Sequence, residues 1–249
     1  MSEALYDHLG VGYARHRRPD PRIAAQVVRS LGSCGSVLNV GAGTGSYEPE
    51  DRPVFAVEPA IAMIGQRRPG AAPAVVATAG SLPVRDRAVA ASLAILTIHH
   101  WPDWRRGLRE MQRVSGDRVV LLTWDPGHEG FWLVQEYFPA ILAIDRAIFP
   151  SLSAVASVLG KIEVRPLPVP ADCTDGFLGA YWRRPAMYLD AGARRAISTF
   201  AKLPDPAPGL GRLEADLRDG SWQARYGGLL DRAELDVGYR LVIGRGGCA

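Results

Sequence analysis

The chain has 249 residues, of which 47% are hydrophobic and 22% charged, and its formal net charge is +3. This composition is typical of one globular domain with a sizeable core, and it excludes a disordered chain. The basic residues are scattered singly or in pairs, so we expect no nucleic-acid partner. The three cysteines form no CxxC pair, which argues against a zinc site or a disulfide framework and favours a reducing, cytoplasmic setting.

The sequence predicts a soluble protein. The first residues, MSEALYDHLG, lack the basic-then-apolar order of a signal peptide. The most apolar stretch, 137–160, is interrupted by Asp145, Arg146 and Pro150. We therefore expect that it does not cross a bilayer as one helix.

Short apolar runs alternate with helical patterns, which predicts a mainly parallel sheet covered by helices. Leu108, Met111 and Val114 recur at helical spacing, for example, and Gly116 follows them. We predict strands at 37–41, 54–58, 74–77, 89–97, 118–124, 161–170 and 237–245, and helices at 20–31, 60–67 and 103–114.

After residue 125 the chain becomes aromatic and apolar, and we interpret 126–160 as a helical lid. The segment 171–237 is too long for an ordinary loop and predicts an insertion before the last strand. Inserts of this kind carry specificity, so we expect this one to set substrate choice.

The stretch VLNVGAGTG (37–45) is a strand that runs into glycines, which lets a ligand approach the backbone. The next strand ends at Glu58, where a carboxylate can accept hydrogen bonds from both ribose hydroxyls of a nucleoside and repels the 2′-phosphate of NADP. Ser46 stands where a pyrophosphate-binding loop has its third glycine, and Pro49 leaves little room for a phosphate-binding helix. The loop therefore favours a nucleoside with a non-phosphate tail over NAD.

Several motifs in residues 35–125 together resemble the class I S-adenosylmethionine-dependent methyltransferases, in particular the type 11, ubiquinone/menaquinone-type small-molecule branch. They are VLNVGAGTG, AVEPA followed by Met63, AGSLPVRDRAVAASLAILTIHHWPDWRRGLREMQRV and DRVVLLTWDP. The resemblance implies an α/β, Rossmann-like fold, with a seven-stranded, mostly parallel sheet sandwiched by helices and a helical lid or insert from the C-terminal half. It also implies an N-terminal helical segment (1–34) over the cofactor site, a cofactor-binding core (35–125) and the rest of the same domain (126–249).

The same resemblance implies S-adenosyl-L-methionine as the cofactor, and from the cysteine pattern we expect no metal. Asn39 stands where the family usually has aspartate, Gly80 replaces a usual glutamate, and Thr78 takes the place of an acidic residue near the adenine, so we expect weaker electrostatics around the cofactor. The implied cofactor-binding residues are Tyr13, Arg15, Asn39, Gly41, Ala42, Gly43, Glu58, Pro59, Met63, Thr78, Ala79, Leu96 and Thr97.

Methyl transfer depends mainly on holding the acceptor in line with the methyl group, and a base is needed only if a proton must leave. His99 and His100 follow the fourth strand and are the candidate bases, although a packing role is the main alternative. Neighbouring side chains point to different sides, so we expect at most one of them to face the site. The candidate substrate residues are Phe131, Trp132, Tyr137, Asp172, Tyr181 and Trp182, with Asp175 beside them; packing of the lid and turn formation are the alternatives.

We therefore predict an enzyme that methylates a small, partly apolar or aromatic molecule. The alternatives are a protein that uses the same scaffold for a non-methylating reaction or only for binding, an NAD-dependent oxidoreductase, and a module with a vestigial pocket. The sequence leaves open the methylated atom (O, N, C or S) and whether the chain is a monomer or a homodimer.

Overall fold

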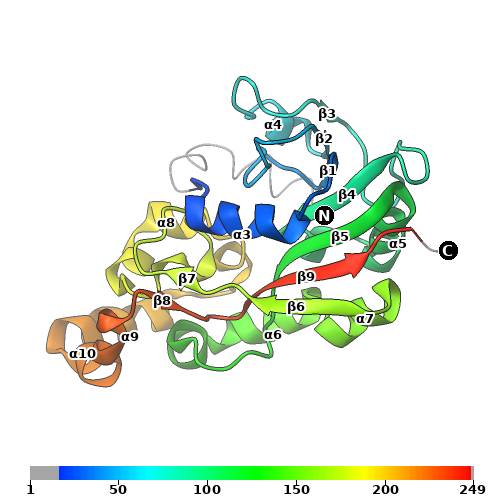
Figure 1. The fold of residues 1–249 in the computed structure, drawn as a ribbon. Helices are drawn as coiled ribbons and strands as arrows, with labels where there is room; N and C mark the ends of the chain where they lie inside the picture. Colours follow the sequence, from blue (N-terminus) through cyan, green and yellow to red (C-terminus); the bar gives the residue numbers. More distant parts are fainter. Residues whose placement is uncertain (1–16, 248–249) are drawn as a thin grey trace.

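Seven strands form one sheet in the order β3-β2-β1-β4-β5-β9-β6 in the computed structural model, which describes residues 17–247 (Figure 1). The strands from β3 to β5 run parallel, and β9 is antiparallel to both of its neighbours. The predicted Rossmann-like, mostly parallel, seven-stranded sheet is thereby confirmed. The strands are β1 (Val37–Val40), β2 (Val54–Val57), β3 (Ala74–Val75), β4 (Val89–Ile95), β5 (Ser115–Trp124), β6 (Ile162–Pro166) and β9 (Tyr239–Arg245).

Helices cover both faces of the sheet. Helix α3 (Pro21–Leu31) packs on one face, and α5 (Trp104–Val114) and α7 (Leu152–Leu159) pack on the other (Figure 1). Because successive strand residues point to opposite faces, Val37 belongs to the core under α3, whereas Leu38 and Val40 belong to the core under α5. The two buried clusters are thus separated by the sheet itself.

The helices follow their local signals. Asp20 caps α3, its carboxylate accepts a hydrogen bond from the Arg22 N–H, and a proline opens the first turn. Asp103 caps α5 in the same way through the Arg106 N–H. No helix forms between β1 and β2, as Pro49 predicts, and α4 (Ile61–Ile64) is shorter than the predicted 60–67.

The C-terminal half supplies the remaining elements, and Figure 1 shows α8, α9 and α10 gathered beyond one end of the long strands. The predicted strand 161–170 is divided, because β7 (Val169–Pro170) leaves the main sheet to pair with β8 (Glu234–Leu235). The other elements are η1 (Ile98–His100), η2 (Leu133–Tyr137), α6 (Pro139–Ile148), η3 (Leu178–Tyr181), η4 (Pro185–Leu189), α8 (Ala191–Arg195), η5 (Phe200–Lys202), α9 (Ala207–Asp219), α10 (Ser221–Tyr226) and η6 (Gly227–Asp231).

The stretch Pro139–Leu159 is long and apolar enough to be a candidate membrane span, with a mean hydropathy of 1.5. In the structure it is divided into α6 and α7 on either side of Pro150. Ile141 and Asp145 of α6 and Leu159 of α7 are buried in the domain. These buried positions contribute to the two cores and to the cavity described below.

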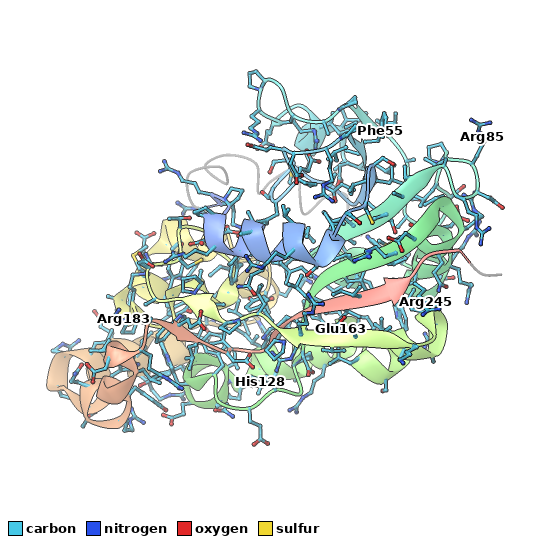
Figure 2. The ribbon with its side chains drawn as sticks, in the orientation of Figure 1. Phe55, Arg85, His128, Glu163, Arg183 and Arg245 are labelled. Carbon is cyan, nitrogen blue, oxygen red and sulfur yellow. The ribbon has the colours of Figure 1, made fainter. Side chains whose placement is uncertain are left out.

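The large apolar side chains that remain exposed gather mainly at the β2–β3 edge. Phe55 of β2 and Val75 of β3 are each about half exposed, and Val76 and Ile61 are exposed nearby. Figure 2 labels Phe55 at this edge and Arg183 on the opposite side of the molecule, in the part of the chain from 126 to 249, which is called the C-terminal segment below.

Candidate active site

A single cavity of about 570 Å³ joins the carboxyl ends of β1, β2 and β4 to the C-terminal segment. Its first wall comprises the glycine loop after β1 and the residues that follow β2 and β3. Its second wall comprises η1, α6, the start of β9, and residues between 177 and 199. The cavity therefore lies where ligands bind in open α/β sheets, beyond the carboxyl ends of the strands.

The glycine loop is held against β2 by its own backbone. The N–H groups of Gly41 and Ala42 donate to the Val57 carbonyl at 2.8 and 3.0 Å. Gly41 has a φ of +68°, and a Cβ there would lie 2.3 Å from Thr97 Oγ1, so only glycine fits. Gly43 has a φ of +52° and lines the cavity, with Met63 Cε 3.5 Å from the place of a Cβ.

Glu58 lies at the end of β2, as the sequence predicts. One carboxylate oxygen accepts from the Gly43 N–H at 2.8 Å and the other from the Ala60 N–H at 3.0 Å. The side chain is buried yet lines the cavity. Each oxygen of a carboxylate has a second lone pair, so Glu58 retains acceptor capacity for hydroxyl groups of a ligand.

A buried ion pair supports the glycine loop from beneath. Arg67 contacts both carboxylate oxygens of Glu48 at 2.7 and 2.8 Å, and both side chains are only 6% exposed. Arg67 also donates to the Gly43 carbonyl, and the Asn39 amide donates to Glu48 at 3.0 Å. Glu48 thus supplies, close to Asn39, the negative charge that Asn39 lacks. The sequence did not predict this role of Glu48, because its partner Arg67 lies 19 residues away in the chain.

Asn39 keeps one polar atom without a hydrogen-bond partner among residues 17–247. This atom, Oδ1, is buried and belongs to a residue of the cavity wall. A buried unpaired acceptor is costly, so a donor group of a bound ligand would stabilise it.

Two residues of the cavity wall have backbone strain. Leu96 has a φ of 49° and Tyr47 a φ of 63°, values that side chains other than glycine rarely adopt. Leu96 directly follows β4, which ends at Ile95, two residues before the predicted 97. The Tyr47 hydroxyl donates to Asp175 at 2.7 Å, and burial raises the pKa of Tyr47 well above its usual value. Asp175 also pairs with Arg17 at 2.7 Å, and Arg17 lines the cavity.

The structure places every implied cofactor residue from Asn39 to Thr97 around this one cavity. Thr78 and Ala79 line it. Gly80 faces the Arg106 side chain, and a Cβ added to Gly80 would lie 3.6 Å from the Cδ of Arg106. Tyr13 and Arg15 lie outside the described residues.

Both His99 and His100 line the cavity, which corrects the expectation that at most one would. They lie in the short helix η1 rather than on extended chain, so their side chains share one wall, with ring centroids 3.8 Å apart. Burial lowers the pKa of His99 well below its ordinary value, and burial lowers the pKa of His100 to about 4. At neutral pH both imidazoles are therefore uncharged and weakly basic.

Asp145 is a further residue of the site, and the sequence did not predict it. This carboxyl of α6 is buried, lines the cavity, and accepts a hydrogen bond from Thr199 Oγ1 at 3.3 Å. Burial raises the pKa of Asp145 to about 7, against the opposing charge of Lys202 and the Thr199 hydrogen bond. An acidic residue within an otherwise apolar run was the available signal, since buried carboxyls with displaced pKa values concentrate at functional sites.

None of the six candidate substrate residues lines the cavity. Trp132 is the centre of a buried aromatic cluster and makes edge contacts with Tyr137 and Trp222, at centroid distances of 5.7 and 5.5 Å. Its indole N–H donates to the Trp182 carbonyl at 3.0 Å. Phe131, Tyr181 and Trp182 are buried as well. Their apolar area serves the packing of the C-terminal segment, which was the alternative expectation.

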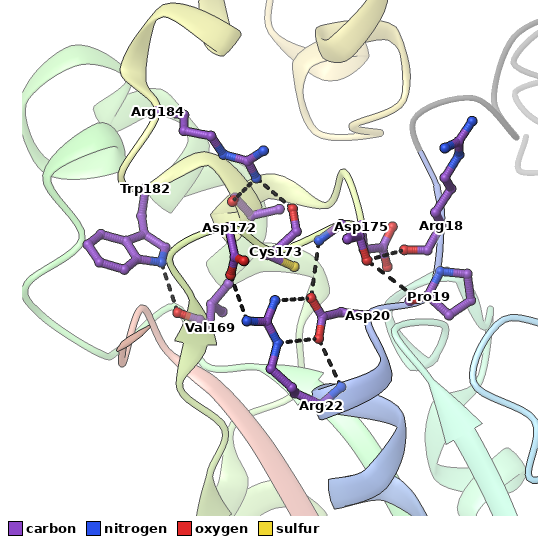
Figure 3. Close-up of polar contacts among 12 residues, drawn as sticks. Arg18, Pro19, Asp20, Arg22, Val169, Asp172, Cys173, Asp175, Trp182 and Arg184 are labelled. Carbon is purple, nitrogen blue, oxygen red and sulfur yellow. Dashed lines mark hydrogen bonds and ion pairs between the residues drawn. The ribbon is translucent and has the colours of Figure 1, made fainter. Parts of the chain in front are cut away.

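Asp172 joins the C-terminal segment to α3. Figure 3 shows Arg22 between Asp20 and Asp172, with the Asp172 carboxylate 2.6 Å from the guanidinium. Asp20 in turn accepts from the Thr174 N–H at 3.1 Å. Asp172 therefore fixes the loop after β7 to the helix, on the surface and away from the cavity wall.

The aromatic residues that do line the cavity are different ones. Trp124 ends β5 and Phe149 follows α6, and their rings meet edge to face at 5.9 Å. Phe177 and Tyr239 also line it, 4.7 Å apart. Within residues 17–247 no group of three or more His, Cys, Asp or Glu side chains could hold a metal ion.

Comparison with known proteins adds a family and a fold. Residues 38–121 match the family model described as "Methyltransferase domain". A protein from Anabaena variabilis, described as "Putative methyltransferase from antibiotic biosynthesis pathway", has a similar structure: the identity is 33%, the TM-score is 0.83, and 92% of this chain and 99% of that chain are covered. No protein of curated function matches the chain.

Two more distant structures share the fold alone. Geranyl diphosphate C-methyltransferase from Streptomyces coelicolor, solved with Mg²⁺, geranyl diphosphate and S-adenosyl-L-homocysteine, is 17% identical with a TM-score of 0.52, over 89% of this chain and 75% of that chain. The [4+2]-cyclase SpnF is 15% identical with a TM-score of 0.52, over 92% and 82%.

Proposed function

The chain belongs to the S-adenosylmethionine-dependent methyltransferases, and we propose that its cavity binds S-adenosyl-L-methionine and a small, partly apolar or aromatic acceptor that receives the methyl group. The observation that carries this proposal is the continuity of the cavity: the glycine loop and Glu58 form one wall and an apolar chamber with Trp124 and Phe149 forms the other.

The residues of the first wall suit this cofactor. Glu58 offers acceptors for the ribose hydroxyls, and the buried Asn39 Oδ1 offers one for a donor of the methionine part. Arg17 also lines this wall, where its guanidinium is paired with Asp175. When bound, the cofactor supplies a methyl group on a sulfonium, which is electrophilic without help from a metal or an acid.

The residues of the second wall would hold the acceptor in line with that methyl group. Positioning of this kind can supply much of the rate enhancement, because it converts a bimolecular step into a unimolecular one. Residues 177, 178 and 196–199 of the insertion line the chamber, which supports a role of that segment in acceptor choice. Two buried free cysteines, Cys34 and Cys173, support a reducing, cytoplasmic setting.

The test is a calorimetric and thermal-shift titration with S-adenosylmethionine, S-adenosylhomocysteine and NAD in parallel. We expect the two adenosyl compounds to bind and to stabilise the fold by about 2.7 kcal/mol at 100 times their Kd, and NAD to have no effect. Binding of NAD alone would contradict the proposal. Since a cyclase shares the fold, transfer of labelled methyl to product then separates methylation from a non-methylating reaction on the same scaffold.

A further inference from the structure

Asp145 of α6 lines the acceptor side of the cavity together with the aromatic ring of Phe149, the residue that directly follows this helix. The Phe149 N–H donates to the backbone carbonyl of Asp145 at 2.8 Å, which holds the two residues one helical turn apart. Phe149 stacks on His99, with ring centroids 4.0 Å apart and planes inclined by 22°. The carboxyl thus lies beside an apolar aromatic surface and is only 1% exposed.

The charged and titratable groups around Asp145 come from three other elements. The two histidines belong to η1, Lys202 to η5, and Tyr239 to β9. The charge of Lys202 lowers the pKa of Asp145 and of both histidines, and Asp145 contributes to the raised pKa of Tyr239, so these groups act on one another.

The basicities of these groups differ greatly. Burial raises the pKa of Asp145 to about 7, whereas burial lowers the pKa of His100 to about 4. A general base works best when its pKa lies near the working pH, because it is then both deprotonated and basic enough to accept a proton. Asp145 meets this condition, and neither histidine does.

We propose that Asp145 is the general base of this site and that the acceptor is an uncharged or cationic molecule with a hydroxyl or amine nucleophile on an aromatic or apolar body. This inference rests on the proposed methyl transfer. The nucleophile's lone pair forms the new bond to the methyl carbon, the electron pair of the broken C–S bond stays on sulfur, and the nucleophile's proton passes to the Asp145 carboxylate. The positive charge of the sulfonium and the negative charge of the carboxylate both disappear, so the step is balanced.

The chamber around Asp145 supports this acceptor class. Trp124, Phe149, Phe177 and Leu178 provide apolar walls, which favour an aromatic or hydrocarbon body. An anionic acceptor would be repelled by the carboxylate in this buried setting. The Thr199 hydroxyl, as a donor to Asp145, orients the carboxylate toward the cavity without neutralising it.

The first experiment needs no acceptor. Thermal unfolding of the unmodified protein and of the Asp145→Asn variant is measured between pH 5 and 8. The matched control is Glu129→Gln, which changes an exposed carboxylate outside the cavity wall. A carboxyl whose pKa is higher in the folded than in the unfolded state costs stability as pH rises between the two values. The difference in Tm between Asp145→Asn and the unmodified protein should therefore increase in favour of the variant up to about pH 7 and then level off. A difference independent of pH would overturn the assignment.

The second experiment uses named probes: 4-propylphenol, phenethylamine, propylbenzene and 4-propylbenzoate, each with S-adenosylmethionine. We expect methylation of the phenol or the amine, at least about 100-fold slower in Asp145→Asn and unchanged in Glu129→Gln. The phenol and amine probes identify which nucleophile is used. Methylation of neither by protein that binds S-adenosylhomocysteine, or a rate in Asp145→Asn within threefold of the parent, would overturn the proposal.

A third variant keeps the test decisive if Asp145→Asn does not fold. Thr199→Val removes a hydrogen bond that lowers the pKa of Asp145, so the rising limb of the rate–pH profile should move to higher pH. An unmoved profile would contradict the role of Asp145. Failure of S-adenosylhomocysteine to bind the unmodified chain would instead refute the proposed function itself.

Discussion

The two ends of the cavity are built on different principles. At the glycine-loop end the ligand-facing surface is mainly backbone, and Glu58, Glu48 and Arg67 hold that backbone in place through paired, hydrogen-bonded charges. At the acceptor end the surface is side chain, and it includes Asp145 and two uncharged histidines.

This difference explains how proteins with the same fold can catalyse different reactions. A backbone cradle depends on a few glycines and one strand end, so it can stay the same while sequences diverge. A side-chain chamber assembled from η1, α6, β9 and the insertion changes with every substitution in any of them. Buried charge that is paired supports structure at the first end, and a buried carboxyl of raised pKa provides reactivity at the second.

The largest effect is expected from breaking the ion pair under the loop. Arg67→Met leaves Glu48 buried without its cation, which should cost about 3–5 kcal/mol of unfolding free energy in a urea titration. The neighbouring pair Arg68–Glu50 is exposed, so Arg68→Met should cost less than about 1 kcal/mol. Equal losses in the two variants would show that burial of the pair does not matter.

Next in size is the loss of cofactor affinity in Gly43→Val. The added side chain forces a strained φ and occupies the cavity wall, so affinity for S-adenosylhomocysteine should fall about 100-fold, or roughly 3 kcal/mol. Gly130→Val, also at positive φ but outside the cavity, is the matched control and should retain affinity. Normal binding by Gly43→Val would mean that the loop is not the cradle.

A smaller loss is expected for Glu58→Ala. The change leaves the Gly43 and Ala60 N–H groups and the ribose hydroxyls without their acceptor, which should weaken cofactor binding by about 1–3 kcal/mol. Glu58→Gln retains one acceptor oxygen, so its cofactor affinity, measured by calorimetry, should lie between the affinities of the unmodified protein and of Glu58→Ala. Unchanged affinity in both would contradict the ribose assignment.

The smallest effect concerns the surface link between α3 and the insertion. Burial acts to raise the pKa of Asp20, but hydrogen bonds from Arg22 and Thr174 lower the pKa to about 2. A lowered pKa stabilises the fold above the unfolded value and loses that contribution as pH falls from about 4 to 2. Asp20→Asn, which still caps the helix, should therefore cost about 1–2 kcal/mol at pH 7 and less than about 0.5 kcal/mol near pH 2. Asp103→Asn, an exposed cap of α5, should change stability by less than about 0.5 kcal/mol at either pH.

The cofactor end was predictable because its signals are local. A strand, three glycines and a second strand ending in Glu58 lie within residues 37–58, and parallel strands bring their ends to one edge. The support of the loop was not predictable, since Glu48 and Arg67 become partners only when the turns after β1 and α4 meet.

The acceptor end was less predictable, because an aromatic residue looks the same in sequence whether it lines a chamber or fills a core. Trp124 and Phe149 face the cavity, whereas Trp132 and Trp182 pack inside the C-terminal segment. Asp145 and Thr199 are 54 residues apart, and only the path of the insertion brings them together. The histidine prediction was misled by assuming extended chain where a short helical turn forms.

The small β7–β8 sheet closes the base of the insertion. Val169 pairs with Leu235, and the Ala171 N–H donates to the Ala233 carbonyl at 2.8 Å, so the chain leaves and re-enters the domain at one place. When the ends of a long segment are joined in this way, a change in its length alters the free energy of folding only slightly, because the entropic cost of loop closure grows slowly with the number of residues. Residues 171–233 therefore leave and re-enter the fold at one place, so a change of length in their exposed turns leaves the strand ends in position, whereas Asp175 must be kept because it binds Tyr47 of the glycine loop.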